Sequence, residues 1–141
     1  MMSHALVAMQ FVLIGLIAVR LDPAAIGTAF MVLLAAGGGV GAWSLAANRP
    51  SNINIRPEPK EGGQLVTHGP YRLVRHPMYL AVLLFGAAFA TAGDAVQWAL
   101  LGALAAVLYA KALREERGLA LVHPGYADYR ARTRAIIPFV L

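Results

Sequence analysis

The sequence predicts an all-α polytopic membrane protein with four transmembrane helices, and three observations support this fold class. Hydrophobic residues make up 59% of the 141 residues and charged residues only 13%, outside the range of soluble globular domains. The apolar residues form four long runs. The basic residues gather in the segments that an even number of spans would leave on one side of a membrane. A single integral membrane domain, 1–141, is therefore expected.

The first two spans are expected at about residues 5–20 and 24–47. The first carries one polar residue before its end, Gln10, and is stopped by Arg20 and Pro23. A signal peptide is the rival interpretation, but no Lys or Arg precedes the run and no small-x-small cleavage site follows it. The second run is long enough to span a core of about 30 Å at roughly 1.5 Å per residue.

Two glycines in the second run, Gly37 and Gly41, have Gly-x-x-x-Gly spacing. Such a pair lets another helix approach closely. Two interpretations stay open: packing against another helix of the same chain, and a homodimer contact between two copies.

The segment 48–76 should lie outside the bilayer, because prolines break any helix in its first part. These prolines are Pro50, Pro57 and Pro59. Pro77 then opens a third span, about 77–92, since a proline suits the first helical position. The fourth span, about 94–113, continues into the tail 114–141, and the two helices form an antiparallel hairpin.

Four spans place residues 48–76 and 111–141 on the same face as His4. That face carries eleven of the twelve Lys and Arg residues: Arg49, Arg56, Lys60, Arg72, Arg75, Lys111, Arg114, Arg117, Arg130, Arg132 and Arg134. By the positive-inside rule it is cytosolic. The protein is expected in the inner (plasma) membrane with both termini in the cytosol. The net charge of +5 is then a membrane asymmetry, so the bilayer is the expected partner and nucleic acid is rejected.

Residues 62–79 combine two histidines, two arginines, two tyrosines, two prolines and three glycines between apolar segments. The hairpin should bring its Arg75-His76-Pro77 start close to Glu115-Glu116 at the end of the fourth span. A bland alternative exists: Lys111 and Glu115 are four residues apart and could pair on a helix surface, a contact of about 0.2–0.5 kcal/mol.

Several kinds of site are excluded or poorly supported. The chain has no cysteine, which excludes disulfides and thiolate metal sites. No metal site is predicted, because His68, His76 and His123 lack metal-ligand spacing. Neither a nucleophile elbow nor a phosphate-binding glycine loop is found.

The stretch 65–79 reads Leu-Val-Thr-His-Gly-Pro-Tyr-Arg-Leu-Val-Arg-His-Pro-Met-Tyr, and Arg114-Glu115-Glu116 follows further along the chain. The tail then adds Tyr126, Tyr129, Arg134 and Pro138. Together these residues resemble the isoprenylcysteine carboxyl methyltransferase and phospholipid methyltransferase superfamily of integral membrane enzymes. The resemblance covers about residues 57–138. The first two spans add nothing diagnostic to it.

The resemblance implies S-adenosylmethionine-dependent methyl transfer, with S-adenosylhomocysteine as product, at a cytosolic-face site formed by the last helical hairpin and the tail. The implied cofactor-binding residues are Gly63, Gln64, Leu65, Val66, Tyr71, His76, Pro77, Met78, Tyr79, Glu115 and Glu116. Arg75 and His76 are assigned as catalytic. The implied substrate-binding residues are Lys111, Tyr126, Tyr129 and Arg134, and Lys111 replaces an arginine that the eukaryotic carboxyl methyltransferases associate with the methyl acceptor.

The residue types also suit this cofactor on physical grounds. Helix-start N–H groups beside His76 and Arg75 suit its carboxylate. Glu115 can pair with its ammonium or bond its ribose. The rings of Tyr71 and Tyr79 can face the adenine or the sulfonium, a cation–π contact of about 0.5–2 kcal/mol.

The acceptor is expected to be a lipid-like or small apolar molecule that enters from the bilayer, and its reacting atom (O, N or S) stays open. The tail has two interpretations, an interfacial anchor or a segment that closes the site. Two alternative functions are an NADPH-dependent membrane reductase of the sterol-reductase type and a small four-helix transporter or structural membrane protein. The transporter is disfavoured, because no acidic residue lies within a predicted span away from its ends.

Overall fold

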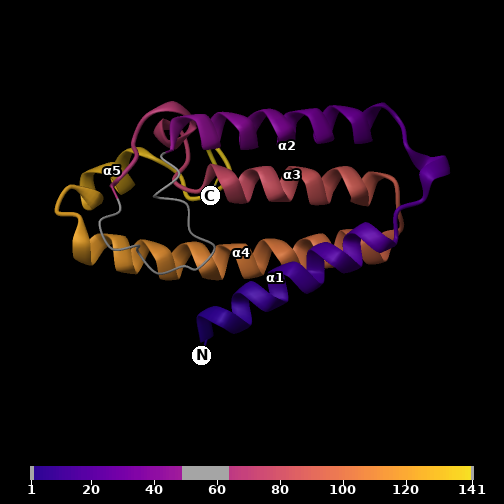
Figure 1. Ribbon diagram of the computed structural model, residues 1–141, viewed down its shortest axis with the longest axis horizontal. Helices are drawn as coiled ribbons and strands as arrows, with labels where there is room; N and C mark the ends of the chain where they lie inside the picture. Colours follow the sequence, from indigo (N-terminus) through magenta and orange to yellow (C-terminus); the bar gives the residue numbers. More distant parts are fainter. Residues whose placement is uncertain (1, 49–63, 141) are drawn as a thin grey trace.

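The computed structural model describes residues 2–48 and 64–140, and the regular structure in these ranges is helical. Four long helices lie side by side as a bundle, with a short fifth helix at one end (Figure 1). The α-helices are α1 (Met2–Val19), α2 (Thr28–Ala47), α3 (Pro77–Thr91), α4 (Ala95–Val122) and α5 (Tyr126–Arg132). Two 3-10 helices, η1 (Pro23–Ala25) and η3 (Gly69–Arg72), lie in the connections. The predicted all-α class is therefore confirmed for the described residues.

The second helix, α2, begins at Thr28, a turn later than the start of the span expected at about 24–47. Pro23–Ala25 forms the 3-10 helix η1, whose N-cap Asp22 accepts a hydrogen bond from the Ala24 N–H at 2.9 Å. The Asp22 side chain thus bonds a backbone N–H that an α-helix would otherwise use, and α2 begins only at Thr28. At the other end of the chain, α4 ends at Val122 because the following residue, His123, precedes a proline and adopts an extended conformation.

Two helices, α2 and α4, are long and apolar enough to cross a membrane by length and composition. The other two, α3 and the His4–Val19 part of α1, are shorter apolar helices. Large apolar side chains are exposed on the outside of the bundle, among them Val12, Val32 and Trp98. Such a surface suits lipid. The crossing of a membrane by all four helices stays a prediction.

The two glycines of α2 contact α3 of the same chain. A Cβ added at Gly37 would lie 3.2 Å from the Ala81 carbonyl oxygen and 3.2 Å from a ring carbon of Phe85. A Cβ at Gly41 would lie 3.6 Å from the Ala81 Cβ. The pair thus lets α2 and α3 pack closely, which is the intramolecular interpretation. The homodimer through Gly37 and Gly41 stays a prediction.

One end of the bundle is tied by polar contacts between the turns. Arg20 and Asp94 form an exposed ion pair at 2.5 Å, and the Asp22 N–H donates to the Ala92 carbonyl. Asp94 also caps α4 in a capping box with Gln97, whose fully buried amide donates to the Ile17 carbonyl at 3.0 Å. These contacts fix how α1, α3 and α4 leave this end.

The opposite end gathers the sequence motifs. In Figure 1, α1 and α3 run in one direction and α2 and α4 in the other, so residues 64–76 meet α5 and the residues that follow it. The buried core runs along the bundle from Leu13 and Ile17 of α1 and Leu104 and Leu108 of α4 to Ile136 of the tail.

Candidate functional site

His76 joins the two sequence motifs. It is the N-cap residue of α3 and is only 6% exposed. Its Nε2 lies 3.2 Å from Oε1 of Glu116, and its Nδ1 lies 3.5 Å from Oε2 of Glu115. The predicted meeting of the helix start and the acidic pair is thereby confirmed, because antiparallel α3 and α4 bring these ends together.

Arg75 is held by the acidic pair and by the tail. Its Nε donates to Oε1 of Glu116 at 2.7 Å, and its Nη1 donates to the Thr133 carbonyl at 2.6 Å. Glu116, whose side chain is 4% exposed, also lies 3.4 Å from Nε of Arg130. A buried carboxylate with several cationic partners is well compensated. Arg75 and Glu116 therefore connect α3, α4 and α5, while a catalytic role for Arg75 stays a prediction.

The tail pairs with the backbone just before α3. Val74 and Arg134 form an isolated parallel bridge, and the Arg75 and His76 N–H groups donate to the Arg134 and Ala135 carbonyls at 2.8 and 2.9 Å. The Tyr129 hydroxyl donates to the Tyr71 carbonyl at 2.7 Å. These bonds fix the tail to the segment that precedes α3, and a role of the tail in closing the site stays a prediction. The exposed Phe139 beyond them fits an interfacial position.

The amides at the start of α3 are mostly used within the chain. The N–H groups of Tyr79 and Leu80 donate to the His76 carbonyl, and that of His76 donates to the tail. Pro77 has no N–H. Helix-start N–H groups were expected to bind the cofactor's carboxylate. Among the described residues at the start of α3, only the N–H of Met78 is left for this role.

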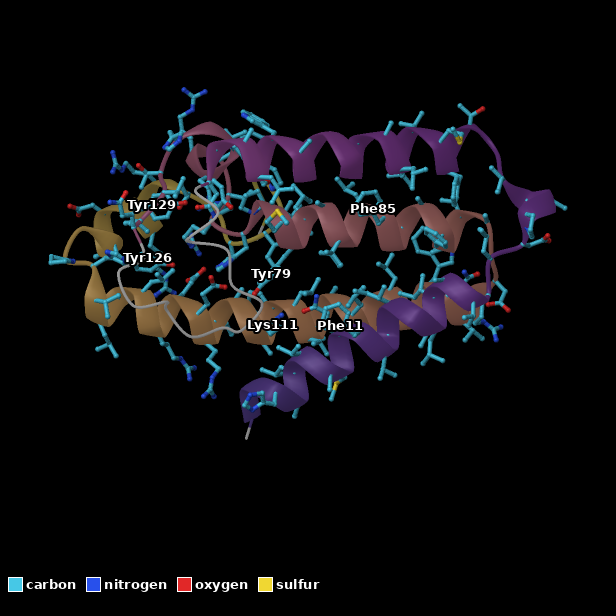
Figure 2. The ribbon with its side chains drawn as sticks, in the orientation of Figure 1. Phe11, Tyr79, Phe85, Lys111, Tyr126 and Tyr129 are labelled. Atoms are coloured by element: carbon cyan, nitrogen blue, oxygen red, sulfur yellow. The ribbon has the colours of Figure 1, made fainter. Side chains whose placement is uncertain are left out.

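Tyr79 lies at the centre of a second group of contacts. Its hydroxyl donates to Oε2 of Glu115 at 3.1 Å, and its ring stacks on that of His76 with centroids 5.2 Å apart. Lys111 Nζ lies 5.2 Å from the centroid of the same ring and donates to Oε1 of Gln10. Figure 2 shows Tyr79 between α3 and α4, close to Lys111, with Phe11 of α1 beside them.

A cavity of about 240 Å³ lies against these residues. Its lining includes eight residues that the sequence assigned to the site: Tyr71, Arg75, His76, Pro77, Met78, Tyr79, Lys111 and Glu115. The remaining lining residues come from α1, the end of α2 and one further position of α3: Gln10, Phe11, Ser44, Leu45, Asn48 and Val82. The cavity thus combines carboxylate, ammonium and aromatic groups at one end of the bundle.

The other assigned residues lie outside this lining. Gln64 is exposed, Leu65 and Val66 are half-buried, and Gly63 falls outside the described residues. Arg134 is exposed and takes part through its backbone. Tyr126 and Tyr129 are buried in edge-to-face contact, with centroids 6.0 Å apart, and Figure 2 shows them at the α5 end of the bundle, beyond Tyr79 and Lys111. Glu115 lines the cavity, whereas Glu116 does not and is more deeply buried.

Burial and the two neighbouring carboxylates have opposite effects on the pKa of His76. Burial favours the neutral ring, but hydrogen bonds to Glu115 and Glu116 outweigh it and raise the pKa of His76 above its ordinary value of 6.5. Burial also raises the pKa of the Tyr71 hydroxyl, against a smaller opposite effect of Asn48. The two carboxylates thus favour the protonated form of the His76 ring.

The residues from α1 and α2 were missed by the sequence reasoning. Gln10 is the lone polar residue within its apolar run, and Ser44 and Asn48 are one turn apart at the end of the next run. Asn48 donates from Nδ2 to the Tyr71 hydroxyl at 3.3 Å, and its buried Oδ1 has no hydrogen-bond partner. Isolated polar residues in apolar runs were the available signal.

The fold and the site together define a helical membrane protein whose bundle holds, at one end, a cavity with charged and polar side chains in its lining. The phospholipid methyltransferase family matches residues 27–123, more than half of the chain, so the chain belongs to this family. This match confirms the resemblance seen in the sequence, and it extends through α2, which had seemed uninformative. The family is one of membrane methyltransferases.

One curated relative is similar over part of its length. The cobalt-zinc-cadmium resistance protein CzcN of Cupriavidus metallidurans is 40% identical over 82 residues, which are 56% of this chain and 38% of that protein. The chain thus spans well under half of the relative. No solved structure matches the chain. In the part of this chain that the structure describes, no group of three histidine or acidic residues could hold a metal ion.

Proposed function

We propose that the protein is an S-adenosylmethionine-dependent methyltransferase that acts on a lipid-like or small apolar acceptor reached from the bilayer. The observation that carries the proposal is the cavity in which Tyr71, His76, Tyr79 and Glu115 meet, because these residues come from two separate sequence motifs of a methyltransferase family. Bound S-adenosylmethionine would supply an electrophilic methyl group. The chain's own residues would bind, orient and shield the reactants.

The residues present fit the cofactor's charged and polar groups. Glu115 offers a carboxylate in the cavity to an ammonium or a ribose, and the buried Asn48 Oδ1 is an unsatisfied acceptor in the same lining. The Met78 N–H at the start of α3 suits the cofactor's carboxylate. The rings of Tyr71 and Tyr79 offer faces to a flat base or a sulfonium.

A second cavity supports an apolar acceptor. It measures about 180 Å³ and is lined wholly by apolar residues: Ile14, Ile17, Ala18, Val82, Phe85, Gly86, Phe89 and Leu104. Val82 lines both cavities. Along α1 and along α3, the second lining follows the first by one or two helical turns, so the apolar cavity lies deeper in the bundle. An acceptor with its polar head near Lys111 and its apolar chain in this cavity would fit both.

The direct test is ligand binding by the purified full chain in detergent. A ligand that binds the folded state raises its thermal stability. S-adenosylhomocysteine should raise the unfolding temperature, whereas NADPH and lipophilic cations should not. Stabilisation by NADPH instead would favour the reductase, and stabilisation by the cations alone would favour the transporter. Methyl transfer from labelled S-adenosylmethionine to phosphatidylethanolamine, prenylcysteine analogues and apolar thiols then identifies the acceptor class, and a preference for a fully water-soluble acceptor would contradict the proposal.

A further inference from the structure

Lys111 and Glu115 do not pair, although their spacing favours it. They lie four residues apart on α4, where opposite charges are neighbours. No ion pair joins them among the described residues. Lys111 Nζ instead donates to Oε1 of Gln10 and lies over the Tyr79 ring, while Oε2 of Glu115 accepts from the Tyr79 hydroxyl. The Tyr79 side chain thus contacts both charged groups.

Because Lys111 is buried, its ammonium group depends on a partner within the protein. Lys111 is 1% exposed and Gln10 is 8% exposed. An ammonium withdrawn from water needs an acceptor, and an uncompensated one is strongly destabilising. The Gln10 amide oxygen supplies that acceptor from a different helix, α1. Glu115, one turn further along α4, is the carboxylate whose charge acts on Lys111, so it is the acceptor to which Lys111 would turn if Gln10 gave none.

We propose that Gln10 is a positioning residue of the cofactor site. By holding Lys111 on the α1 side of the cavity, it keeps the carboxylate of Glu115 available to the ammonium or ribose of bound S-adenosylmethionine. This assignment rests on the proposed function. It gives α1, which carries none of the family's motifs, a part in cofactor binding through the contact of Gln10 with Lys111.

The test uses methionine as an unbranched apolar replacement of similar length. S-adenosylhomocysteine affinity is measured by calorimetry on the detergent-purified full chain. Gln10→Met should raise Kd about tenfold, the scale of losing a hydrogen bond to a charged group. Lys111→Met alone supplies the reference Kd for a second background without the ammonium. In that background the same Gln10→Met change should alter Kd by less than about twofold, because no competing ammonium remains.

The comparison of the two backgrounds separates positioning from structural support. If Gln10→Met weakened binding equally in the wild-type and Lys111→Met backgrounds, Gln10 would be a structural residue and the assignment would be overturned, as it would by unchanged affinity in Gln10→Met. If Gln10→Met does not fold, Gln10→Glu serves instead: it keeps an oxygen acceptor for Lys111 and should keep the wild-type Kd, and a tenfold loss would overturn the assignment. Absence of binding by the wild-type chain overturns the proposed function itself, and the assignment with it.

Discussion

The Tyr79 hydroxyl donates to Oε2 of Glu115 at 3.1 Å and joins the first turn of α3 to α4. The bond occupies one oxygen of a carboxylate whose side chain is 31% exposed in the cavity. Its neighbour Glu116 has a 4% exposed side chain that is bound by Arg75, His76 and Arg130. The same substitution at these two adjacent positions should therefore have different effects.

Glu115→Gln should weaken S-adenosylhomocysteine binding by about 1.5–3 kcal/mol, because the amide cannot pair with a cationic group as a carboxylate does. Calorimetry on detergent-purified protein measures the change. Asp128→Asn, the same chemical change at an exposed position on α5, is the matched control and should bind as the wild type does. Equal affinity in Glu115→Gln and the control would contradict a cofactor-binding role for Glu115.

Glu116→Gln should act on stability. It leaves the buried guanidinium of Arg75 without its carboxylate, and breaking a buried ion pair costs about 3–5 kcal/mol. The unfolding temperature in detergent should fall clearly below those of the wild type and of Glu115→Gln. Equal unfolding temperatures for the two glutamine variants would show that Arg75 and Glu116 do not hold α3, α4 and the tail together.

Stability should also depend on pH through His76. The pKa of His76 is raised in the folded protein by Glu115 and Glu116, so the charged histidine stabilises the fold fully below its ordinary pKa of 6.5. That contribution is lost as the pH rises through the raised pKa. Unfolding temperatures measured from about pH 6 upward should fall accordingly. His76→Gln should remove this part of the slope, and exposed His68→Gln should keep it; identical slopes in all three proteins would sink the prediction.

Gly86 should limit the length of the acceptor's apolar chain. A Cβ at this position would lie 2.8 Å from Leu101 Cδ1 and 3.9 Å from Ile17 Cδ1, so Gly86→Ala should narrow the apolar cavity. Methyl transfer to alkyl thiols and alkyl amines of increasing length should shift toward shorter chains. Gly102→Ala is the matched control, since a Cβ there meets nothing within 4 Å. An unchanged length preference in Gly86→Ala would argue against an acceptor chain in this cavity.

Reporter fusions should place four positions relative to the membrane. The basic residues of the expected cytosolic face predict cytosolic signals from fusions at Met1, near Pro59 and at Leu141, and a signal from the opposite side for a fusion near Gly93. A cytosolic signal at Gly93 would refute the four-span arrangement.

The hairpin of α3 and α4 could be predicted from the sequence because its signals are local. Pro77 marks the helix start, the turn before Ala95 reverses the chain, and antiparallel geometry then brings His76 to Glu115. The later start of α2 at Thr28 could not be predicted from hydropathy, because both segments before and after it are apolar. It depends on the cap that Asp22 forms.

The contributions of α1 and α2 to the cavity depend on which helices become neighbours. Hydrophobic runs do not specify neighbours, so nothing in the sequence paired Gln10 with Lys111 or Asn48 with Tyr71. The contacts of the Arg75 side chain could not be predicted either. Its main partners include the Thr133 carbonyl, and a backbone acceptor has no sequence signature.

The bridge between Val74 and Arg134 has a consequence for biosynthesis. The backbone N–H groups of Arg75 and His76 find their acceptors on Arg134 and Ala135, which leave the ribosome after all four long helices. A nascent chain whose helices are already inserted would still have these two donors unpaired and Arg75 without its contact to Thr133. Packing of the four long helices and fixing of the Arg75-His76 backbone are thus separate events in time, and a chain that stopped after α4 would lack the acceptors of both N–H groups.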